Sequence, residues 1–167
     1  MNLIKKIKSY PRFEELKKQV IELQESTGLK MISLQYQDPN DTSWGNAEGY
    51  KYGPVEHKFT SLQPSLVGTE IDRLFQEIGM PIVRTRIMRI DPYSSYIVHL
   101  DPTPRIHIPI ITNKECRFFF PKAENTFGDY MPADGSVYWV DTRKYHTFIN
   151  NSPYPRTHIV GITQEIL

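Results

Sequence analysis

Cysteine is nearly absent from this sequence, with Cys116 the only one among 167 residues. One cysteine cannot form a disulfide within the chain, and no charged and then apolar leader precedes the first elements that we expect. No apolar run approaches the roughly 20 residues that a membrane-spanning helix requires. A disulfide-stapled scaffold and a helical membrane protein are therefore excluded, and we expect a protein of the reducing cytoplasm with no membrane partner.

An excess of charge of either sign is also lacking. The 20 lysines and arginines against 19 aspartates and glutamates give a formal net charge of +1 at pH 7. A nucleic-acid-binding protein usually carries a basic stripe, and none is found here. We therefore expect no nucleic-acid partner.

The length and the turn-forming residues favour one compact domain built largely of short strands. A chain of 167 residues is long enough for one core and too short for two, so residues 1–167 are expected to form a single domain. The 13 prolines, 9 glycines and 20 aromatic residues (10 Tyr, 8 Phe and 2 Trp) are typical of β segments joined by turns.

The first 81 residues predict mainly helical and loop support. A one-faced helix is expected from Ser9 and Pro11 to a stop at Gly28, because apolar residues recur at helical spacing between them. A strand is predicted at 31–36. A second helix is predicted over 69–78, closed by the Gly79-Met80-Pro81 sequence.

The segment from Gln37 to Gln63 breaks both periodicities. Turn residues alternate there with large rings, which are Trp44, Tyr50, Tyr52 and His57. A long loop that holds aromatic residues inside a compact domain is often functional. Two interpretations stay open: a lid over the substrate, or a cover for the side or mouth of a barrel. A metal-binding role is not expected for His57.

After Pro81 the chain changes to short strands. The predicted segments are 82–90, 96–99, 105–112, 116–120, a weak one at 127–131, 136–140, 145–150 and 156–163. About eight such strands predict a jelly roll, the cupin-like double-stranded β-helix, over residues 82–163. The expected fold class is thus mainly β, with two N-terminal flanking helices.

Three residues of this region have the chemistry of a metal centre. His99 and Asp101 lie two residues apart, so both project from one side if that segment is extended. His146 supplies a second imidazole. Two imidazoles and one carboxylate on one face form the triad that holds non-haem Fe(II), with open positions where a bidentate organic acid and O2 can bind.

Arg156 is the candidate for holding the far end of such an acid. A dianion such as 2-oxoglutarate carries a distal carboxylate, which the planar fork of an arginine grips through two hydrogen bonds. Arg105 and His107 share one face of their strand, and Arg156 and His158 share one face of theirs. If these faces point inward, we expect the polar residues at the mouth of the barrel and the apolar ones deeper.

The ordered set of motifs resembles a known family. His-x-Asp, Arg-x-His, His and Arg follow one another, with 141–146 and the Asn151-Ser152-Pro153 sequence ahead of Arg156. This order resembles the aspartyl/asparaginyl β-hydroxylase branch of the Fe(II)/2-oxoglutarate dioxygenases over roughly 82–162. Because it has a carboxylate at Asp101, the chain resembles the members of this family that bind iron through a full triad. Met88 departs from the members that place a hydroxyl residue near that position.

The resemblance implies an Fe(II)- and 2-oxoglutarate-dependent hydroxylase that consumes O2. It assigns His99, Asp101 and His146 to the metal and to catalysis, and Arg156 to the distal carboxylate of 2-oxoglutarate. Arg105 and His107 would assist at the co-substrate or contact a carboxylate of the substrate. His158 would bind the co-substrate or serve as a core histidine.

Several alternatives stay open from the residues alone. The substrate is an aspartyl or asparaginyl side chain in a peptide or protein, or a free amino acid. Zn(II) also accepts His, Asp and His ligands, which would suit a hydrolase, and a non-catalytic jelly roll could bind a metal or a small acid. Asp101 could cap the turn that follows it, and Arg156 could pair with Asp141, which could instead orient His146.

Overall fold

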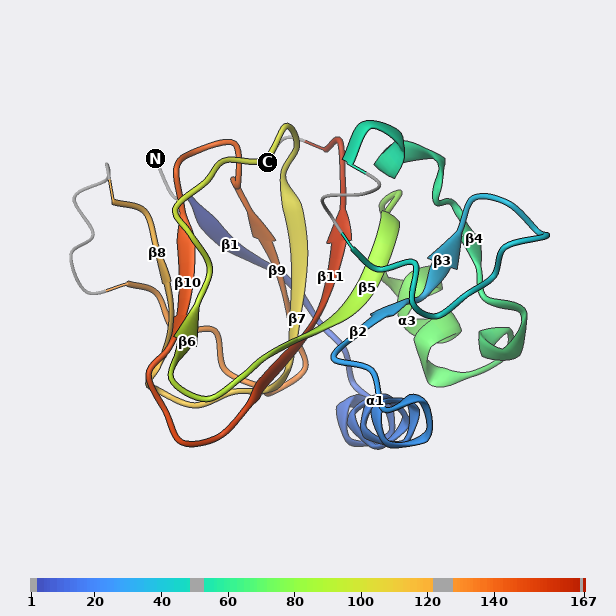
Figure 1. Ribbon diagram of the computed structural model, residues 1–167, viewed down its shortest axis with the longest axis horizontal. Helices are drawn as coiled ribbons and strands as arrows, with labels where there is room; N and C mark the ends of the chain where they lie inside the picture. The colour runs from blue at the N-terminus through green and yellow to red at the C-terminus, as the bar shows by residue number, and fades with distance from the viewer. Residues whose placement is uncertain (1–2, 49–52, 122–127, 166) are drawn as a thin grey trace.

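The computed structural model describes residues 3–48, 53–121, 128–165 and 167, and its elements are labelled in Figure 1. Among these residues the helical elements are α1 (Phe13–Thr27), α3 (Glu70–Ile78) and the 3-10 helices η1 (Gly53–Lys58) and η2 (Pro64–Leu66). The early strands are β1 (Ile4–Ser9), β2 (Met31–Ser33), β3 (Gln35–Tyr36) and β4 (Ser61–Leu62). The later strands are β5 (Val83–Ile90), β6 (Ser94–Ser95), β7 (Arg105–Ile111), β8 (Cys116–Phe119), β9 (Ser136–Val140), β10 (Thr147–Asn150) and β11 (Arg156–Ile162).

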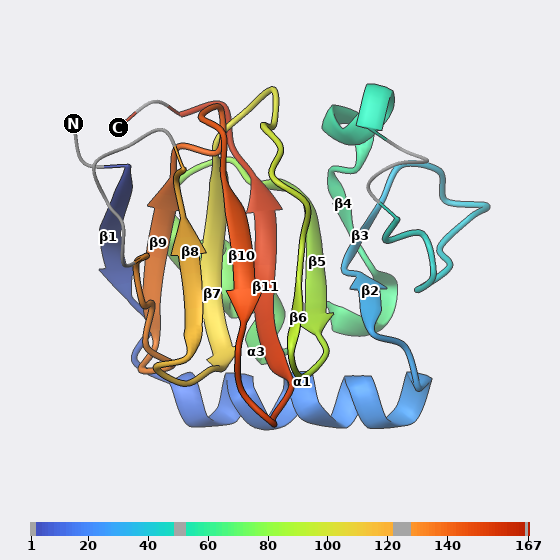
Figure 2. The same ribbon diagram turned by 60° about the vertical axis from the view of Figure 1, so that its left-hand side comes forward.

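Two antiparallel sheets face each other. The larger has the order β1-β9-β7-β11-β5-β2, and the smaller has the order β6-β10-β8. The small sheet covers one face of the large sheet, and α1 and α3 lie against the other face (Figures 1 and 2). This arrangement confirms the predicted jelly roll with two flanking helices from the N-terminal part of the chain.

Side chains along the strands of the large sheet alternate between two faces. One face packs against the helices in the apolar core, and the other faces the small sheet and carries polar residues. On β7 the side chains of Ile106, Ile108 and Ile110 are buried in the cluster that includes Leu16 of α1 and Leu74 of α3. The intervening residues of β7 face the small sheet. The helices therefore supply the main hydrophobic core, and the opposite face of the same strands remains available for a site.

A second, smaller apolar cluster lies at the other face of the large sheet. It contains Cys116, Phe118, Phe120, Met131 and Phe148. Cys116 is free and buried, and it packs as the small hydrophobic residue that the sequence predicts.

Helices α1 and α3 each end directly before a glycine. Gly28 and Gly79 follow the last residues of α1 and α3 with φ of 66° and 75°, a left-handed conformation that glycine adopts without a steric penalty. The predicted start of the first helix at Ser9 and Pro11 is wrong. Ile4–Ser9 forms edge strand β1 instead, whose lysines at three of six positions obscure a period of two.

Other boundaries also differ from the expectation. The predicted strand at 31–36 is split into β2 and β3, and the segment at 96–99 contributes an isolated bridge between His99 and His146 after the short β6. In the weak segment at 127–131, Asp129 forms a single bridge with Phe118, and Phe127 lies outside the described residues. Since β1 and β2 flank the large sheet, the sheet extends beyond 82–163. No helix among the described residues is long and apolar enough to span a membrane.

The core between the large sheet and the helices predicts a stability difference between two isoleucines. Ile159 is 0% exposed, whereas Ile97 is 83% exposed. Ile159→Ala should lower the free energy of unfolding by about 2–5 kcal/mol, because it removes buried methylenes and leaves a cavity. Ile97→Ala should change it by less than about 0.5 kcal/mol. Urea denaturation of the two variants measures both values, and equal losses would contradict this packing.

Candidate metal centre and ligand pocket

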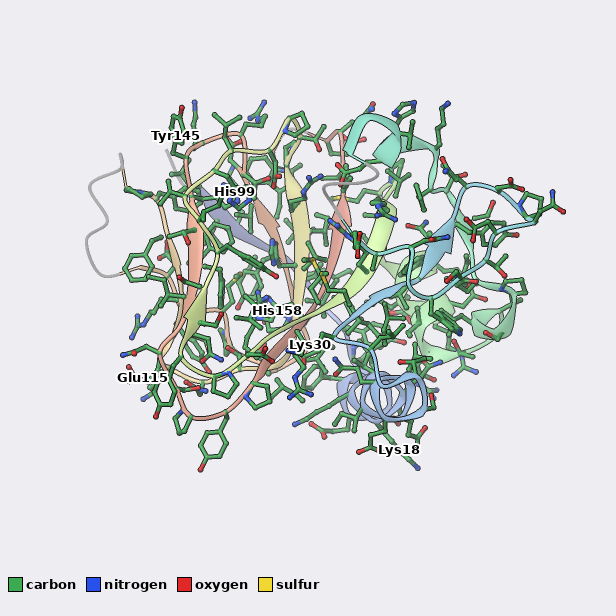
Figure 3. The ribbon with its side chains drawn as sticks, viewed as in Figure 1. Lys18, Lys30, His99, Glu115, Tyr145 and His158 are labelled. Atoms are coloured by element: carbon green, nitrogen blue, oxygen red, sulfur yellow. The ribbon has the colours of Figure 1, made fainter. Side chains whose placement is uncertain are left out.

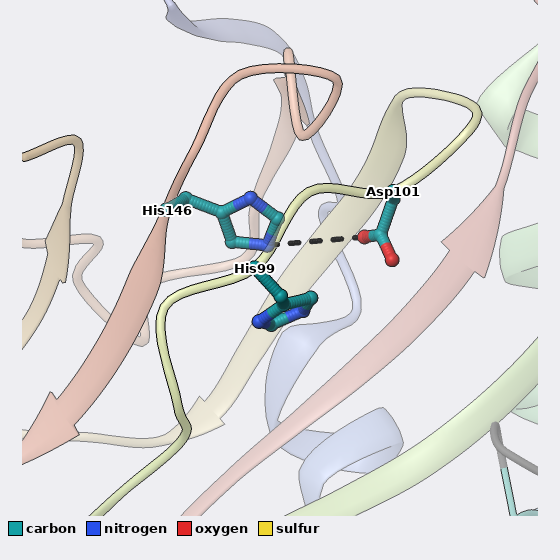
Figure 4. Close-up of side chains that lie close together, drawn as sticks. All are labelled: His99, Asp101 and His146. Atoms are coloured by element: carbon teal, nitrogen blue, oxygen red, sulfur yellow. Dashed lines mark ion pairs between the residues drawn. The ribbon is translucent and has the colours of Figure 1, made fainter. Parts of the chain in front are cut away.

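The three predicted metal ligands lie together at one end of the barrel (Figure 4). His99 and His146 are joined by two backbone hydrogen bonds, His99 N to His146 O at 3.0 Å and His146 N to His99 O at 2.8 Å. Their ring centroids are 4.4 Å apart. One ligand atom from each of His99, Asp101 and His146 can be chosen so that all three lie within 4.8 Å of one another. The backbone pairing thus brings together residues that are 47 positions apart in the sequence.

The orientation of both imidazoles suits metal binding through Nε2. The Nδ1 atom of His99 is 2.8 Å from the carbonyl oxygen of Ile97, and that of His146 is 2.9 Å from the carbonyl oxygen of Lys144. A carbonyl only accepts, so each Nδ1 must carry the proton and each Nε2 keeps its lone pair. Burial lowers the pKa of His146, which favours the neutral ring that a metal requires.

Asp101 is held by an arginine. Arg105 donates from Nε to Asp101 Oδ2 at 3.1 Å, and its Nη1 donates to Thr103 Oγ1 at 3.0 Å. The same Oδ2 lies 3.8 Å from Nε2 of His146 (Figure 4). Asp101 therefore faces the two imidazoles, and Arg105 is placed to orient this carboxylate.

A pocket of about 630 Å³ opens beside the three residues. Six of the seven residues singled out in the sequence line it, namely His99, Asp101, Arg105, His107, His146 and Arg156. The seventh, His158, is fully buried, with Nδ1 in contact with Nη2 of Arg156 and 3.4 Å from Nδ1 of His107. The fold thus gathers every predicted site residue around one cavity.

Arg156 is buried without a carboxylate partner among the described residues. Its guanidinium carbon lies 3.8 Å from the ring centroid of Phe148, and its Nε has no hydrogen-bond partner. Burial lowers the pKa of Arg156 to about 9. The alternative partner Asp141 binds Arg143 instead, with Nε to Oδ1 at 2.7 Å. A buried cation with this environment calls for an anion that the described residues do not supply.

The two histidines beside Arg156 are neutral. Burial first, and then the positive charge of Arg156, hold the pKa values of His107 and His158 well below the usual value of 6.5. Neutral rings can donate or accept hydrogen bonds without adding charge to the pocket.

The prediction that all the polar residues lie at the mouth is wrong. Strands β7 and β11 are antiparallel, so Arg105 pairs with Ile162 at one end and Thr157 pairs with Ile111 at the other. Arg105 contacts the metal end, and Arg156 therefore lies toward the opposite, deeper end of the pocket. Figure 3 shows the same order, with His99 near the upper end and His158 further down between the sheets.

Sequence reasoning missed three residues with ionisable side chains that line the pocket. They are Glu56 of η1, Arg86 of β5 and Tyr96 after β6. The alternation of Arg84, Arg86 and Met88 was the one available signal for Arg86, since an inward arginine on a central strand needs a partner. Nothing near Glu56 distinguishes it from a surface carboxylate.

The loop at 37–63 divides into two parts. Trp44 packs against the core cluster and faces a groove beside α1, away from the metal pocket. Tyr50 and Tyr52 lie outside the described residues, and His57 is exposed. Among the described residues of this loop, Glu56 lines the metal pocket. The aromatic part that is described thus covers the core, and the charged part reaches the site.

Comparisons with known proteins support the jelly-roll fold. No protein family description matches the sequence, and no curated protein does. An oxidoreductase of the 2OG-Fe(II) oxygenase family from Burkholderia pseudomallei is similar in structure at 17% identity, covering 91% of this chain and 80% of that chain, with a TM-score of 0.50. The viral collagen prolyl hydroxylase of Paramecium bursaria Chlorella virus-1, in its 2OG complex, is similar at 12% identity, covering 97% of both chains, with a TM-score of 0.51. At these identities the likeness shows a shared jelly-roll fold.

The paired imidazoles predict a loss of metal binding on substitution. His146→Ala should weaken Mn(II) binding by more than the roughly 10- to 100-fold that loss of an outer-shell partner costs, because a direct ligand is removed. His57→Ala, which changes an exposed histidine outside the pocket, should bind Mn(II) as the wild type does. Anaerobic calorimetric titration measures both, and wild-type affinity in His146→Ala would refute the ligand assignment.

The buried neutral histidines predict a pH dependence of stability. Because the folded-state pKa of His158 lies below its unfolded value near 6.5, its stabilising contribution is present above that pH and is lost as the pH falls below it. Each such group contributes up to about 1.4 kcal/mol per pH unit.

The metal-free protein should therefore be less stable at pH 5 than at pH 7, and His158→Asn should reduce that difference. His57→Asn serves as the control with an exposed ring. Denaturant unfolding at the two pH values measures it, and an undiminished difference in His158→Asn would contradict the assignment.

Proposed function

We propose that this protein is an Fe(II)- and 2-oxoglutarate-dependent dioxygenase that hydroxylates a C–H bond. The observation that carries the proposal is the buried guanidinium of Arg156, which has no carboxylate partner among the described residues and lies at the deeper end of the pocket from His99, Asp101 and His146. A ligand that satisfies both ends must chelate a metal at one end and carry an anionic group at the other. 2-Oxoglutarate has this form.

The donor set fits Fe(II). Nε2 of His99 and of His146 and the carboxylate of Asp101 supply two nitrogens and one oxygen from one side, the arrangement of non-haem iron oxygenases. When bound, Fe(II) with 2-oxoglutarate and O2 supplies the oxidising chemistry, and succinate and CO2 are the by-products. The carbonyl oxygens at Nδ1 and the guanidinium of Arg105 keep the three ligands aimed at one point.

The deep end of the pocket is suited to a carboxylate. Arg156 offers a planar fork of donors, and the ring of Phe148 covers one face of the guanidinium and shields it from water. The neutral rings of His107 and His158 flank it without competing for the anion. The two similar structures, a 2OG-Fe(II) oxygenase and a hydroxylase in a 2OG complex, also support the co-substrate.

For the substrate, the motif order supports an aspartyl or asparaginyl side chain in a peptide or protein, hydroxylated in the reducing cytoplasm. Ile97, Val98 and Leu100 are exposed next to His99 and offer an extended chain an apolar surface at the site. Peptide side chains and backbone can pack on such a surface.

A free amino acid is the second candidate substrate, and the buried pair of Glu56 and Arg86 favours it. Two other interpretations explain less. A zinc hydrolase would use the three metal ligands but leaves the buried charge of Arg156 without a role. A non-catalytic binding protein does not require open positions on a metal.

The charge of Arg156 predicts a large effect on co-substrate binding. Arg156→Ala in the Mn(II)-loaded protein should weaken 2-oxoglutarate binding by roughly 2–5 kcal/mol, since one half of a buried charge pair is lost. This corresponds to a dissociation constant raised from about 30-fold to several thousand-fold. Arg89→Ala removes a half-exposed arginine of β5 that pairs with Asp91, and should bind as the wild type does. Calorimetry under anaerobic conditions measures both, and unchanged binding in Arg156→Ala would move the anion site to another arginine.

A further inference from the structure

Arg86 is a second buried arginine that points into the metal pocket. It lies on the same face of β5 as Met88, and both line the cavity. Its side chain is 6% exposed. Its Nη1 donates to the carbonyl oxygen of Ala47 at 3.2 Å, and its Nε has no partner. Burial, and then the charge of Arg105, lower the pKa of Arg86. The described residues thus do not satisfy all the donors of this guanidinium.

Glu56 is the carboxylate that lies between Arg86 and Arg105. Its Oε1 is 3.8 Å from Nη2 of Arg86, and its Oε2 is 3.3 Å from Nη2 of Arg105. Both distances exceed the roughly 2.7–2.9 Å of a strong charge-assisted hydrogen bond. One carboxylate is therefore shared loosely by two cations, and it retains acceptor capacity toward the pocket.

Arg105 and Arg86 differ in how many of their donor atoms are engaged by other side chains. Arg105 directs Nε and both Nη atoms at Asp101, Thr103 and Glu56. Among the described residues, Arg86 has Glu56 as its one side-chain partner, at 3.8 Å. A carboxylate that enters this part of the pocket therefore finds its free donors on Arg86.

We propose that Arg86 and Glu56 form a subsite for the head group of a free α-amino acid. The α-carboxylate binds Arg86, and the α-ammonium group binds Glu56. These two ligand groups are attached to one carbon atom, so they require a cation and an anion of the protein side by side, as Arg86 and Glu56 are. The inference rests on the proposed function and selects the second of its two candidate substrates, a free amino acid.

The same pair disfavours a residue inside a peptide. An internal residue has neither an α-carboxylate nor an α-ammonium group, so it offers Arg86 and Glu56 no opposite charge beyond the loose contacts that they already make with each other and with Arg105. Arg105 connects the subsite to the metal centre, since it contacts both Glu56 and Asp101. A head group held at Arg86 and Glu56 therefore leaves the amino acid's side chain next to the metal ligands.

The test is a binding series on the wild-type protein loaded with Mn(II) and 2-oxoglutarate. The probes are the free L-α-amino acids, beginning with aspartate and asparagine, and for each one that binds, its N-acetyl derivative and its α-carboxamide. Each modification should weaken binding about tenfold or more, because it removes a charge-assisted hydrogen bond in a buried site. Calorimetry or ligand-detected NMR reports binding without turnover.

Two substitutions assign the two contacts. The Glu56→Gln variant should bind the free amino acid and its N-acetyl derivative with similar affinity. It should still bind the free amino acid more tightly than the α-carboxamide. The Arg86→Gln variant should bind the free amino acid and its α-carboxamide with similar affinity, and should still bind the free amino acid more tightly than the N-acetyl derivative. If this variant does not fold, Arg86→Lys, which keeps a positive charge, takes its place. Arg89→Gln on β5 and Glu22→Gln on α1 are matched controls at exposed positions and should retain both preferences.

Three results would overturn the subsite. They are equal binding of the free acid and its N-acetyl carboxamide, tighter binding of an internal aspartyl or asparaginyl peptide than of any free amino acid, and no amino acid binding at all. The series is repeated without 2-oxoglutarate, and 2-oxoglutarate binding is titrated separately. Failure to bind 2-oxoglutarate would remove the proposed function, whereas loss of the head-group preference with 2-oxoglutarate still bound removes the subsite alone.

Discussion

The burial of Arg156, for which the described part of the chain supplies no carboxylate partner, is the constraint on which the rest of the pocket depends. Removing a lone charge from water costs several kcal/mol, and the chain offsets only part of this cost through the ring of Phe148 and the nitrogen of His158. The remainder is available to an anionic ligand, which gains a cation that is already ordered and desolvated. Burial, and then the charge of Arg156, lower the pKa of His158 and keep its ring neutral.

Because β7 and β11 are antiparallel, Arg156 lies at one end of the pocket and the predicted metal ligands lie at the other. Arg105 stands opposite Ile162, so the inward polar residues of the two strands begin at opposite ends of the barrel. The predicted metal ligands gather at the first end, and Arg156 lies toward the second. Between them, Arg105 links Asp101 to Glu56, so the carboxylate that faces the metal and the carboxylate beside Arg86 are held by one guanidinium. Under the proposed function, Arg105 would therefore join the metal centre to the substrate subsite.

Local patterns predicted the parts of this architecture that depend on local physics. Period-two alternation identified the inward faces of β7 and β11, the glycines after α1 and α3 marked the helix ends, and the spacing of His99 and Asp101 placed two ligand side chains together. What failed depends on long-range pairing. The lysine-rich sequence of β1 becomes a strand because β9 offers it an edge, and Glu56 reaches the pocket because η1 packs near β5. The depth of Arg156 follows from strand direction, which no short motif encodes.

Succinate formation is the measurement that tests the central claim most directly. Protein loaded anaerobically with Fe(II) is given 2-oxoglutarate, then air, with and without the panel of free amino acids and of aspartyl- or asparaginyl-containing peptides. The account predicts succinate that depends on Fe(II) and O2 and rises with one class of panel member. No succinate above the metal-free control, together with no binding of 2-oxoglutarate, would contradict it and would leave the pocket as the site of a different metal or of a small acid.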